Sequence, residues 1–311
     1  MPMRIVLLGE PGGWHIERLR AAVVRRGHVA TVVRWQHLTA SVGDEGLRFG
    51  PAEVSAADAI VVRGMPGVAT GTDRLESVVF RMDVLGCLET EGMPVVNRPR
   101  ALEIAIDKYL SLAALARAGV RVPRTVVVQD AEAARAAFAA LGSDCVAKPI
   151  FGSRGRGIAR VSTATAAAAA VSAGGLGYLQ EFLPHAGWDV RVLVIGDQTF
   201  AMRRIAAAGE WRTNISLGGR PEAFAPPTGW LELARRAAAA VGANVAGVDI
   251  LPTDDGPVVL EVNAVPGWQG LQAVTEIDLA NEIAALVERT ARQTSDAGLS
   301  SASGFPGASS A

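Results

Sequence analysis

The two apolar segments that decide the fold are Gly247-Val248-Asp249-Ile250-Leu251 and Val259-Leu260-Glu261-Val262-Asn263. They flank Thr253-Asp254-Asp255-Gly256-Pro257, and a short glycine-containing turn between two apolar segments predicts a β-hairpin. Side chains alternate along a strand, so Glu261 and Asn263 share one face while Leu260 and Val262 share the other. We expect a register in which Asp249 lies beside Glu261.

Two carboxylates and an amide on one side of an apolar hairpin indicate a bound group. Their hard oxygen atoms suit Mg²⁺, which binds through one or two carboxylates plus the phosphates of a substrate. The alternative is a half-exposed sheet with an ordinary polar outer face, and such sheets are common. The hairpin by itself leaves both interpretations open, and the metal site gains support from the rest of the chain.

The composition excludes several classes of function. Half of the 311 residues are apolar and the net charge is −1, which predicts a globular protein of one to three domains without a broad nucleic-acid surface. No apolar stretch is long enough to cross a bilayer, so we expect neither nucleic acid nor membrane as a partner. The only cysteines, Cys87 and Cys145, lie far apart and fit a reducing cytoplasm.

The first hundred residues alternate between strand and helix patterns, which predicts a parallel sheet with covering helices. The expected strands are residues 4–8, 30–34, 59–63 and 93–97, and the expected helices are residues 15–26 and 75–91. The turn at residues 9–14 is not GxGxxG, and no acidic residue ends the second strand. An NAD-dependent oxidoreductase is therefore an alternative that the sequence disfavours.

The remainder of the chain predicts further helices and hairpins. We expect a helix over residues 101–118 that contains Lys108, and a helix over 131–141 that Asp130 caps. The strands Asp189–Ile195 and Thr199–Ile205 should pair across a three-residue turn. A last helix is expected over residues 278–290, followed from residue 293 by a disordered tail of small and polar residues.

A glycine-rich loop follows the apolar strand that ends at Lys148. Its sequence is Phe151-Gly152-Ser153-Arg154-Gly155-Arg156-Gly157, and glycines let successive backbone N–H groups approach phosphate oxygens. The loop lacks the Gly-Lys-Ser/Thr ending of a Walker A motif. An ordinary hairpin tip explains such a loop equally well when it is considered alone.

Several arginines follow downstream, and each of them alone would be an ordinary surface charge. Together, Arg191, Arg203, Arg204 and Arg212 would form a positive wall opposite the carboxylates of the hairpin. Arginine suits the bidentate capture of carboxylate or phosphate. Lysines, a glycine loop, arginines and a Mg²⁺-type triad in this order therefore predict a triphosphate site.

The order of these motifs resembles the ATP-grasp superfamily, specifically the RimK-like carboxylate–amine ligases, which include the alpha-L-glutamate ligases. The segments that carry the resemblance are Val96-Asn97-Arg98, Ile106-Asp107-Lys108-Tyr109, Ala118-Gly119-Val120-Arg121-Val122-Pro123, Val146-Ala147-Lys148-Pro149, the loop 152–157, Gln180-Glu181-Phe182, Trp188-Asp189-Val190-Arg191, Arg212-Thr213-Asn214, Gly218-Gly219, the 247–263 hairpin and Pro266-Gly267.

The resemblance implies an α/β fold that becomes α+β in the C-terminal half. It implies a pre-ATP-grasp domain over residues 1–100, with a parallel sheet, and a small lobe with the glycine-rich loop over 101–184. A C-terminal lobe with the Mg²⁺ site would cover 185–292, and the tail 293–311 would be disordered.

The resemblance also implies a role for each site residue. The ATP-binding residues would be Lys108, Lys148, Gly152, Ser153, Gly155, Gly157, Gln180 and Glu181. The residues facing the γ-phosphate and the acyl substrate would be Arg191, Arg204 and Asn214. The ligands of Mg²⁺, which Mn²⁺ could replace, would be Asp249, Glu261 and Asn263. Trp188, Asp189 and Trp268 are further candidates for the acceptor pocket.

The implied reaction activates a carboxylate as an acyl phosphate, which an amine then attacks to form an amide. The expected partners are an amino acid, glutamate first, and a carboxylate-bearing cofactor or protein C-terminus, with the chain acting as a cytoplasmic homo-oligomer. The general appearance is similar to the branch that modifies tetrahydromethanopterin-type cofactors. Several relatives carry a basic residue in the segment that is Asn214–Gly218 here, and its absence leaves the substrate open. A non-catalytic ATP-binding regulator is the alternative.

Overall fold

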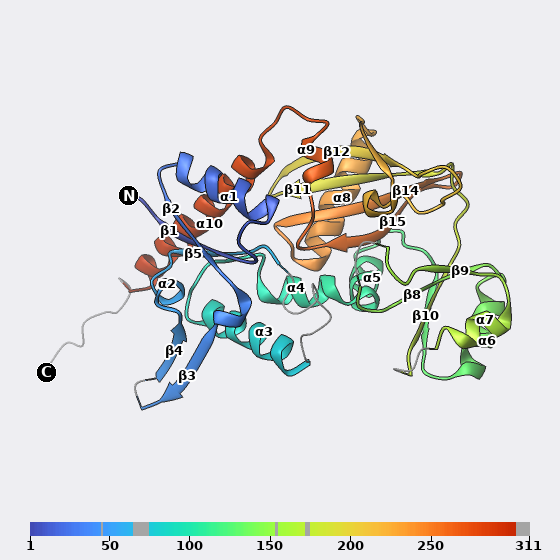
Figure 1. Cartoon of the computed structure of the whole chain (residues 1–311), viewed down its shortest axis with the longest axis horizontal. Coiled ribbons are helices and arrows are strands. Elements are labelled where there is room, and N and C mark those ends of the chain that lie inside the picture. Colours follow the sequence, from blue (N-terminus) through green and yellow to red (C-terminus); the bar gives the residue numbers. More distant parts are fainter. Residues whose placement is uncertain (45, 65–74, 153–154, 172–174, 303–311) are drawn as a thin grey trace, which may run out of the picture. The chain divides into compact units, whose positions relative to one another are not determined.

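The computed structural model describes residues 1–44, 46–64, 75–152, 155–171 and 175–302, with side chains described up to residue 294. Two compact units are present: Met1–Arg100 together with Ile277–Ala311, and Ala101–Glu276 (Figure 1). The first unit thus contains the C-terminal helix in addition to the predicted residues 1–100. Among the described residues, no helix combines the length and the apolar character that a membrane span needs.

The first unit is built on the parallel sheet that the alternating pattern predicts. Its strand order is β2-β1-β5-β6, with every neighbouring pair parallel. The strands are β1 (Arg4–Leu8), β2 (Val29–Val33), β5 (Ala59–Val62) and β6 (Val95–Val96), and the main helices are α1 (Trp14–Arg25) and α3 (Leu75–Thr90). The apolar strands β1 and β5 are almost fully buried, as expected for a parallel sheet covered by helices.

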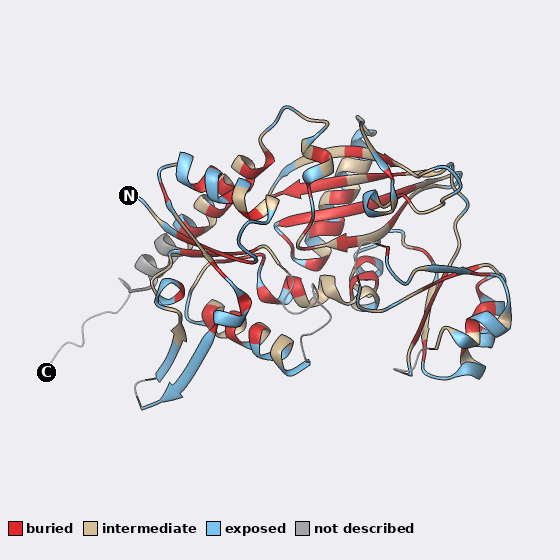
Figure 2. Ribbon diagram, viewed as in Figure 1, coloured by how far each residue is buried: buried red, intermediate tan, exposed pale blue. Residues whose placement is uncertain are grey.

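A hairpin of β3 (Thr39–Gly43) and β4 (Gly46–Gly50) was not predicted, nor were the short elements η1 (Trp35–His37) and α2 (Ala52–Ser55). The hairpin strands are mostly exposed (Figure 2). They contain few large apolar residues, so their sequence lacks the alternation by which a half-buried strand is recognised.

The last helix, α10 (Leu279–Ala302), corrects the predicted start of the tail at residue 293. Ala291 is buried and continues the apolar stripe that Ile283 and Val287 begin, so the helical pattern outlasts the last large side chain. Small alanine residues made this continuation hard to see in the sequence. Residues 303–311 of the predicted tail lie outside the described residues.

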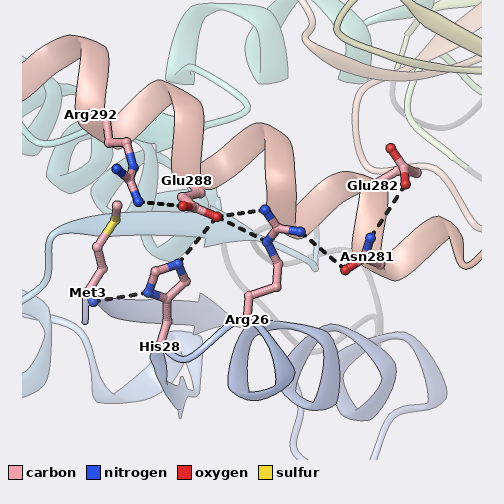
Figure 3. A network of polar contacts seen from close by, with 7 residues as sticks. All are labelled: Met3, Arg26, His28, Asn281, Glu282, Glu288 and Arg292. Carbon is pink, nitrogen blue, oxygen red and sulfur yellow. Dashed lines mark hydrogen bonds and ion pairs between the residues drawn. The ribbon is translucent and has the colours of Figure 1, made fainter. Parts of the chain in front are cut away.

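Polar contacts hold α10 to the rest of the first unit (Figure 3). Glu288 accepts hydrogen bonds from Arg26 at 2.7 and 3.1 Å and from Arg292 at 2.6 Å, and it lies 3.5 Å from His28 Nε2. His28 Nδ1 accepts a hydrogen bond from the backbone N–H of Met3 at 3.2 Å. The hydrogen bond from Arg26 is the main cause that lowers the pKa of Glu288 to about 2.

The second unit begins with two helices where the sequence predicts one. These are α4 (Pro99–Ile106) and α5 (Lys108–Arg117), and Asp107 between them caps α5 by accepting hydrogen bonds from the N–H groups of Tyr109 and Leu110. Lys108 is therefore the first residue of a helix and does not lie inside one, which corrects the expectation. A capping aspartate ends one helix and starts the next because its side chain competes for backbone N–H groups.

Two antiparallel sheets form the body of the second unit. The first has the strand order β7-β10-β8-β9, from β7 (Thr125–Val128), β8 (Cys145–Lys148), β9 (Ala159–Val161) and β10 (Gly177–Glu181). Helices α6 (Ala131–Ala140) and α7 (Ala164–Ala169) pack on it around a core that includes Phe138 and Leu179. Asp130 accepts a hydrogen bond from the N–H of Ala133, so the predicted helix cap is confirmed.

The second sheet has the order β13-β12-β11-β14-β15. Its strands are β11 (Trp188–Ile195), β12 (Gln198–Ile205), β13 (Arg220–Ala223), β14 (Val245–Thr253) and β15 (Gly256–Asn263). Helix α8 (Thr228–Val241) covers β11, β14 and β15, and buried residues concentrate there (Figure 2). The short helices η2 (Ile215–Leu217) and α9 (Gln269–Gln272) complete the unit. Both predicted hairpins are confirmed, β11–β12 and β14–β15.

Candidate active site

A cavity in the second unit is lined by residues of both sheets and of the loops that follow them. It brings together most of the predicted site residues, namely Lys108, Lys148, Gly152, Gly155, Gln180, Glu181, Arg204, Asn214, Asp249 and Glu261. Gly157, Arg191 and Asn263 do not contribute to the lining, and Ser153 lies outside the described residues.

The hairpin that decides the fold pairs Asp249 directly with Glu261, which confirms the expected register. A β-bulge follows, because Ile250 pairs with Val259 and leaves Leu260 without a partner. Leu260 lines the cavity together with Glu261, so the prediction that it belongs to the opposite face is wrong. A bulge locally breaks the alternation of a strand and redirects a side chain.

Two lysines line the cavity, Lys148 from the end of β8 and Lys108 from the start of α5. Lys148 at the end of β8 donates a hydrogen bond to Gln180 Oε1 at 2.6 Å, and Gln180 in turn donates to Thr125 Oγ1 at 2.9 Å. Burial lowers the pKa of Lys148 to about 8. Lys108 Nζ donates to the carbonyl of Gly152 at 2.9 Å, and burial lowers its pKa also. Among the residues that the structure describes, neither ammonium group is in direct contact with a carboxylate.

Two arginines and two aspartates form a buried cluster on the five-stranded sheet. Arg204 Nε donates to Asp189 Oδ1 at 2.8 Å and Arg204 Nη2 lies 2.9 Å from Asp249 Oδ2. Arg191 binds the other side of Asp249, and Thr213 Oγ1 donates to Asp189 at 2.7 Å. Although burial alone would raise the pKa of Asp249, Arg191 and Arg204 together hold it below its usual value.

The glycine-rich loop contacts the segment after β12. Arg212 Nη1 donates to the carbonyl of Ile158 at 3.1 Å, and Glu210 holds the same guanidinium at 2.7 Å. A Cβ on Gly155 would lie 2.8 Å from Asn214 Oδ1, and the positive φ of this residue also favours glycine. The loop therefore needs glycine at this position in order to lie against Asn214.

Comparison with known proteins agrees with this geometry. A family profile described as "RimK-like ATP-grasp domain" matches residues 105–287. The chain is 32% identical over 305 residues to a "Tetrahydromethanopterin:alpha-L-glutamate ligase" of Methanosarcina acetivorans, covering 86% of this chain and 92% of that protein. The chain belongs to the RimK-like ATP-grasp family.

Other relatives extend over nearly the same length. A "Ribosomal protein bS6--L-glutamate ligase" of Shigella boydii is 30% identical over 299 residues, covering 93% of this RimK-like chain and 97% of that protein. The ATP-grasp ligase PsnB, solved with a minimal precursor, has 27% identity and a TM-score of 0.72, and the match covers 93% of this chain and all of PsnB. A RimK domain protein from Sphaerobacter thermophilus has 27% identity and a TM-score of 0.71 over 91% of this chain and 99% of that structure. The predicted family and fold class are confirmed.

The paired carboxylates fit a hard divalent cation by type. Asp249 and Glu261 are cross-strand neighbours, and Asn263 follows on the same strand, which gives the oxygen donors that Mg²⁺ prefers. Within the described part of the chain, no three acidic, histidine or cysteine side chains gather as a metal-binding group. Asn263 Oδ1 accepts a hydrogen bond from the N–H of Val265 at 2.9 Å.

One predicted nucleotide contact already has a strong partner. Glu181 at the end of β10 accepts hydrogen bonds from the backbone N–H of Arg124 at 2.8 Å and from Arg124 Nε at 2.6 Å. Its carboxylate is only 17% exposed, so the pair holds the edge strand β7 to its neighbour β10. Glu181 therefore lines the cavity, but its carboxylate also forms an ion pair with Arg124.

Other residues of the site were harder to predict. Asp189 and Thr213 belong to the buried cluster, and Phe182, His185 and Trp211 form an aromatic group at the cavity, with Phe182 and Trp211 edge to face at 5.6 Å. Asp189 was expected only as a candidate for the acceptor pocket, and its pairing with Arg204 was not predicted. Trp188 packs instead against Phe224, and Trp268 is buried in the core.

Proposed function

We propose that this chain is an ATP- and Mg²⁺-dependent ligase that joins the amino group of glutamate to a carboxylate of a cofactor or of a protein C-terminus. The observation that carries the proposal is the cavity in which two lysines and Arg204 face the carboxylate pair Asp249 and Glu261. Glutamate is suggested by two relatives, which are named as ligases that attach it to tetrahydromethanopterin and to ribosomal protein bS6.

The reaction has two chemical steps. The acceptor carboxylate attacks the γ-phosphorus of ATP, the bond to the β-phosphate oxygen breaks, and ADP leaves an acyl phosphate behind. The glutamate nitrogen then attacks the acyl carbon, and inorganic phosphate and a proton leave as the amide forms. Phosphoryl transfer of this kind needs positioning and charge neutralisation more than covalent chemistry, which suits a site of lysines, arginines and carboxylates.

Positively charged and glycine residues would bind the nucleotide. Lys108 and Lys148 would contact the phosphates, and the loop 152–157 would cover them. Gln180 and Glu181 would lie near the adenine and the ribose. The support is that all these elements surround one cavity, that Lys108 contacts the loop at Gly152, and that a PsnB structure holds Mg and ADP.

The opposite wall would hold the metal and the reacting groups. Asp249, Glu261 and Asn263 would bind Mg²⁺, and Mn²⁺ would substitute for it. The metal would neutralise charge that develops on the phosphates. Arg191, Arg204 and Asn214 would face the γ-phosphate and the acyl group. The pairing of Asp249 with Glu261 supports this assignment.

The setting of the reaction is part of the proposal. Cys87 and Cys145 are both free thiols, which fits a reducing cytoplasm. The family resemblance suggests a homo-oligomer. Sedimentation of the purified chain together with its thiol titration would test both statements.

The deciding experiment measures ADP release with Mg-ATP and glutamate against a panel of acceptors. The panel contains pterin cofactors with a glutamate tail and peptides with different C-termini. Release that needs both glutamate and one acceptor would support the ligase and identify its substrate. Glu261→Gln should lower the release by about two orders of magnitude. Glu222→Gln loses ion pairs with Arg203 and Arg220 at the sheet edge and should keep the release. Nucleotide binding without release for any pair would contradict the proposal.

A further inference from the structure

The carboxylate of Asp249 is already occupied by guanidinium groups. Arg191 binds it through Nε to Oδ1 and through Nη2 to Oδ2 at 2.8 Å, and Arg204 Nη2 approaches Oδ2 at 2.9 Å. The side chain of Asp249 is 6% exposed, so water cannot easily replace these donors. A carboxylate has about four lone-pair positions, and three of them are used here. A cation at the remaining position would lie next to two guanidinium groups whose positive charges repel it, so tight binding of a cation at Asp249 requires at least one arginine to move away.

The two arginines differ in what else they bind. Arg204 also forms a bidentate pair with Asp189, which Thr213 supports by a further hydrogen bond. Among the described residues, Asp249 is the only acceptor for the guanidinium of Arg191. Arg204 can therefore stay with Asp189 when Asp249 takes another partner, but Arg191 cannot keep an acceptor.

The space beside Arg191 is shaped by Gly247. A Cβ at Gly247 would lie 3.2 Å from Arg191 Nη1 and 2.9 Å from the Cβ of Pro266. The missing side chain therefore makes room for the guanidinium along β14. Arg191 is also slightly more exposed than Arg204, at 11% against 5% for the side chain.

The charges of the cluster balance as it stands, with two aspartates against two arginines. A divalent cation at Asp249 would add two positive charges next to a displaced guanidinium. The neighbouring Glu261 does not balance these charges alone, because its negative charge also acts on Lys108 and Lys148, whose pKa values it raises. A buried charge without a partner is strongly unfavourable, so an additional anion has to arrive together with the metal.

We propose that the ion pair with Arg191 blocks Asp249: divalent cations cannot bind this carboxylate until the guanidinium group of Arg191 binds a nucleotide phosphate instead. Metal and nucleotide then bind as one thermodynamic unit. The proposal rests on the proposed function for the assignment of nucleotide and metal to this cavity. Arg191 would thus have two alternative anionic partners, Asp249 and a phosphate. This exchange would account for a metal ligand that is buried between two arginines.

The test is the binding of Mn²⁺ to the full chain without nucleotide, followed by electron paramagnetic resonance of the free ion. The wild type should bind Mn²⁺ weakly. Arg191→Gln should bind it at least about tenfold more tightly, because Asp249 is then released, and Asp249→Asn in the same background should remove the gain. The matched control is Arg203→Gln, which changes an arginine on β12 that pairs with Glu222 and should leave Mn²⁺ binding unchanged.

The proposal is wrong if wild type and Arg191→Gln bind Mn²⁺ equally, or if the gain survives Asp249→Asn. Should Arg191→Gln fail to fold, Arg191→Lys replaces it, since an ammonium cannot occupy both carboxylate oxygens and Mn²⁺ affinity should still rise. A separate titration with a fluorescent ATP analogue in Mg²⁺ tests nucleotide binding by the wild type. If the wild type does not bind the ATP analogue, the proposed function is wrong. If it binds the analogue and the Mn²⁺ affinity of the variant is unchanged, only the proposed role of Arg191 is wrong.

Discussion

Two neighbouring arginines on β12 should differ sharply in what they contribute to stability. Arg204 lies opposite Asp189 in the β11–β12 register, and both side chains are buried, 5% and 2% exposed. Arg203 lies opposite Glu222 in the β12–β13 register, and that pair is 38% and 32% exposed. The same substitution, arginine to glutamine, therefore probes a buried and a half-exposed ion pair at successive positions of one strand.

The expected magnitudes follow from burial. Removing one partner of a buried ion pair costs about 3–5 kcal/mol, and Arg204→Gln deprives both Asp189 and Asp249 of a partner. A half-exposed pair contributes at most about 1 kcal/mol, because water screens its charges. For a unit of this length each kcal/mol shifts the melting temperature by about 2–4 °C. Arg204→Gln should therefore lower it by about 6–20 °C and Arg203→Gln by less than about 4 °C.

Scanning calorimetry and urea unfolding of the two variants measure the difference. Asp189→Asn and the double variant with Arg204→Gln complete a thermodynamic cycle. The coupling energy between the two residues should be about 1–3 kcal/mol, as for groups in one hydrogen-bond network. Equal losses of stability for Arg203→Gln and Arg204→Gln would refute the reasoning. So would a coupling energy near zero, since the structure makes Asp189 and Arg204 direct partners.

Three further predictions concern single charges. Burial lowers the pKa of Lys148 to about 8, so the ammonium group is charged below that pH and loses its charge above it. Nucleotide affinity, measured by fluorescence titration, should therefore fall about tenfold by pH 9. The affinity of Lys148→Arg should not change over the same pH range. Glu261→Gln should lower turnover by about two orders of magnitude in the ADP-release assay, as expected for a lost charge stabiliser, and unchanged turnover would contradict the metal assignment. Glu288, with its pKa lowered to about 2, should stabilise the chain by about 2–3 kcal/mol over Glu288→Gln above pH 5; this advantage should vanish as the pH falls towards 2, and a constant difference in urea unfolding would count against it.

The fold could be predicted where local patterns and tertiary packing agree. The pairing of Asp249 with Glu261 followed from two apolar strands around a short turn, although the bulge at Leu260 interrupts their alternation. The parallel sheet followed from the alternation of strands and helices. The exposed β3–β4 hairpin could not be predicted, because its strands bury too little apolar surface to show a period.

The errors at Asp107 and Leu260 have different origins. The break at Asp107 was readable, because an aspartate that is followed by a helical segment is a good cap, but the apolar period runs through it. The bulge at Leu260 depends on how two strands bend around the cavity, which no local pattern encodes. The end of α10 was missed because alanine gives a weak apolar signal.

The site residues could be named from the sequence, but their pairings could not. Arginines on β11 and β12 look alike in sequence, whereas their cross-strand neighbours divide them into partners of Asp189, Asp249 and Glu222. The same limitation applies to Glu181, since only the structure shows that it binds Arg124. Motifs therefore predicted which residues meet at the cavity, whereas strand pairing determines which carboxylate each arginine pairs with.

The interrupted first unit has a consequence for synthesis of the chain. Its sheet leaves the ribosome early, but α10, which packs on α1, leaves last. Until then the part of α1 that packs on α10 faces water, whereas all strands of the second unit have already been made. Domains usually fold in the order in which they are made. Here we expect the later-made unit to finish first, with the surface of α1 that packs on α10 open to chaperones until α10 has been made.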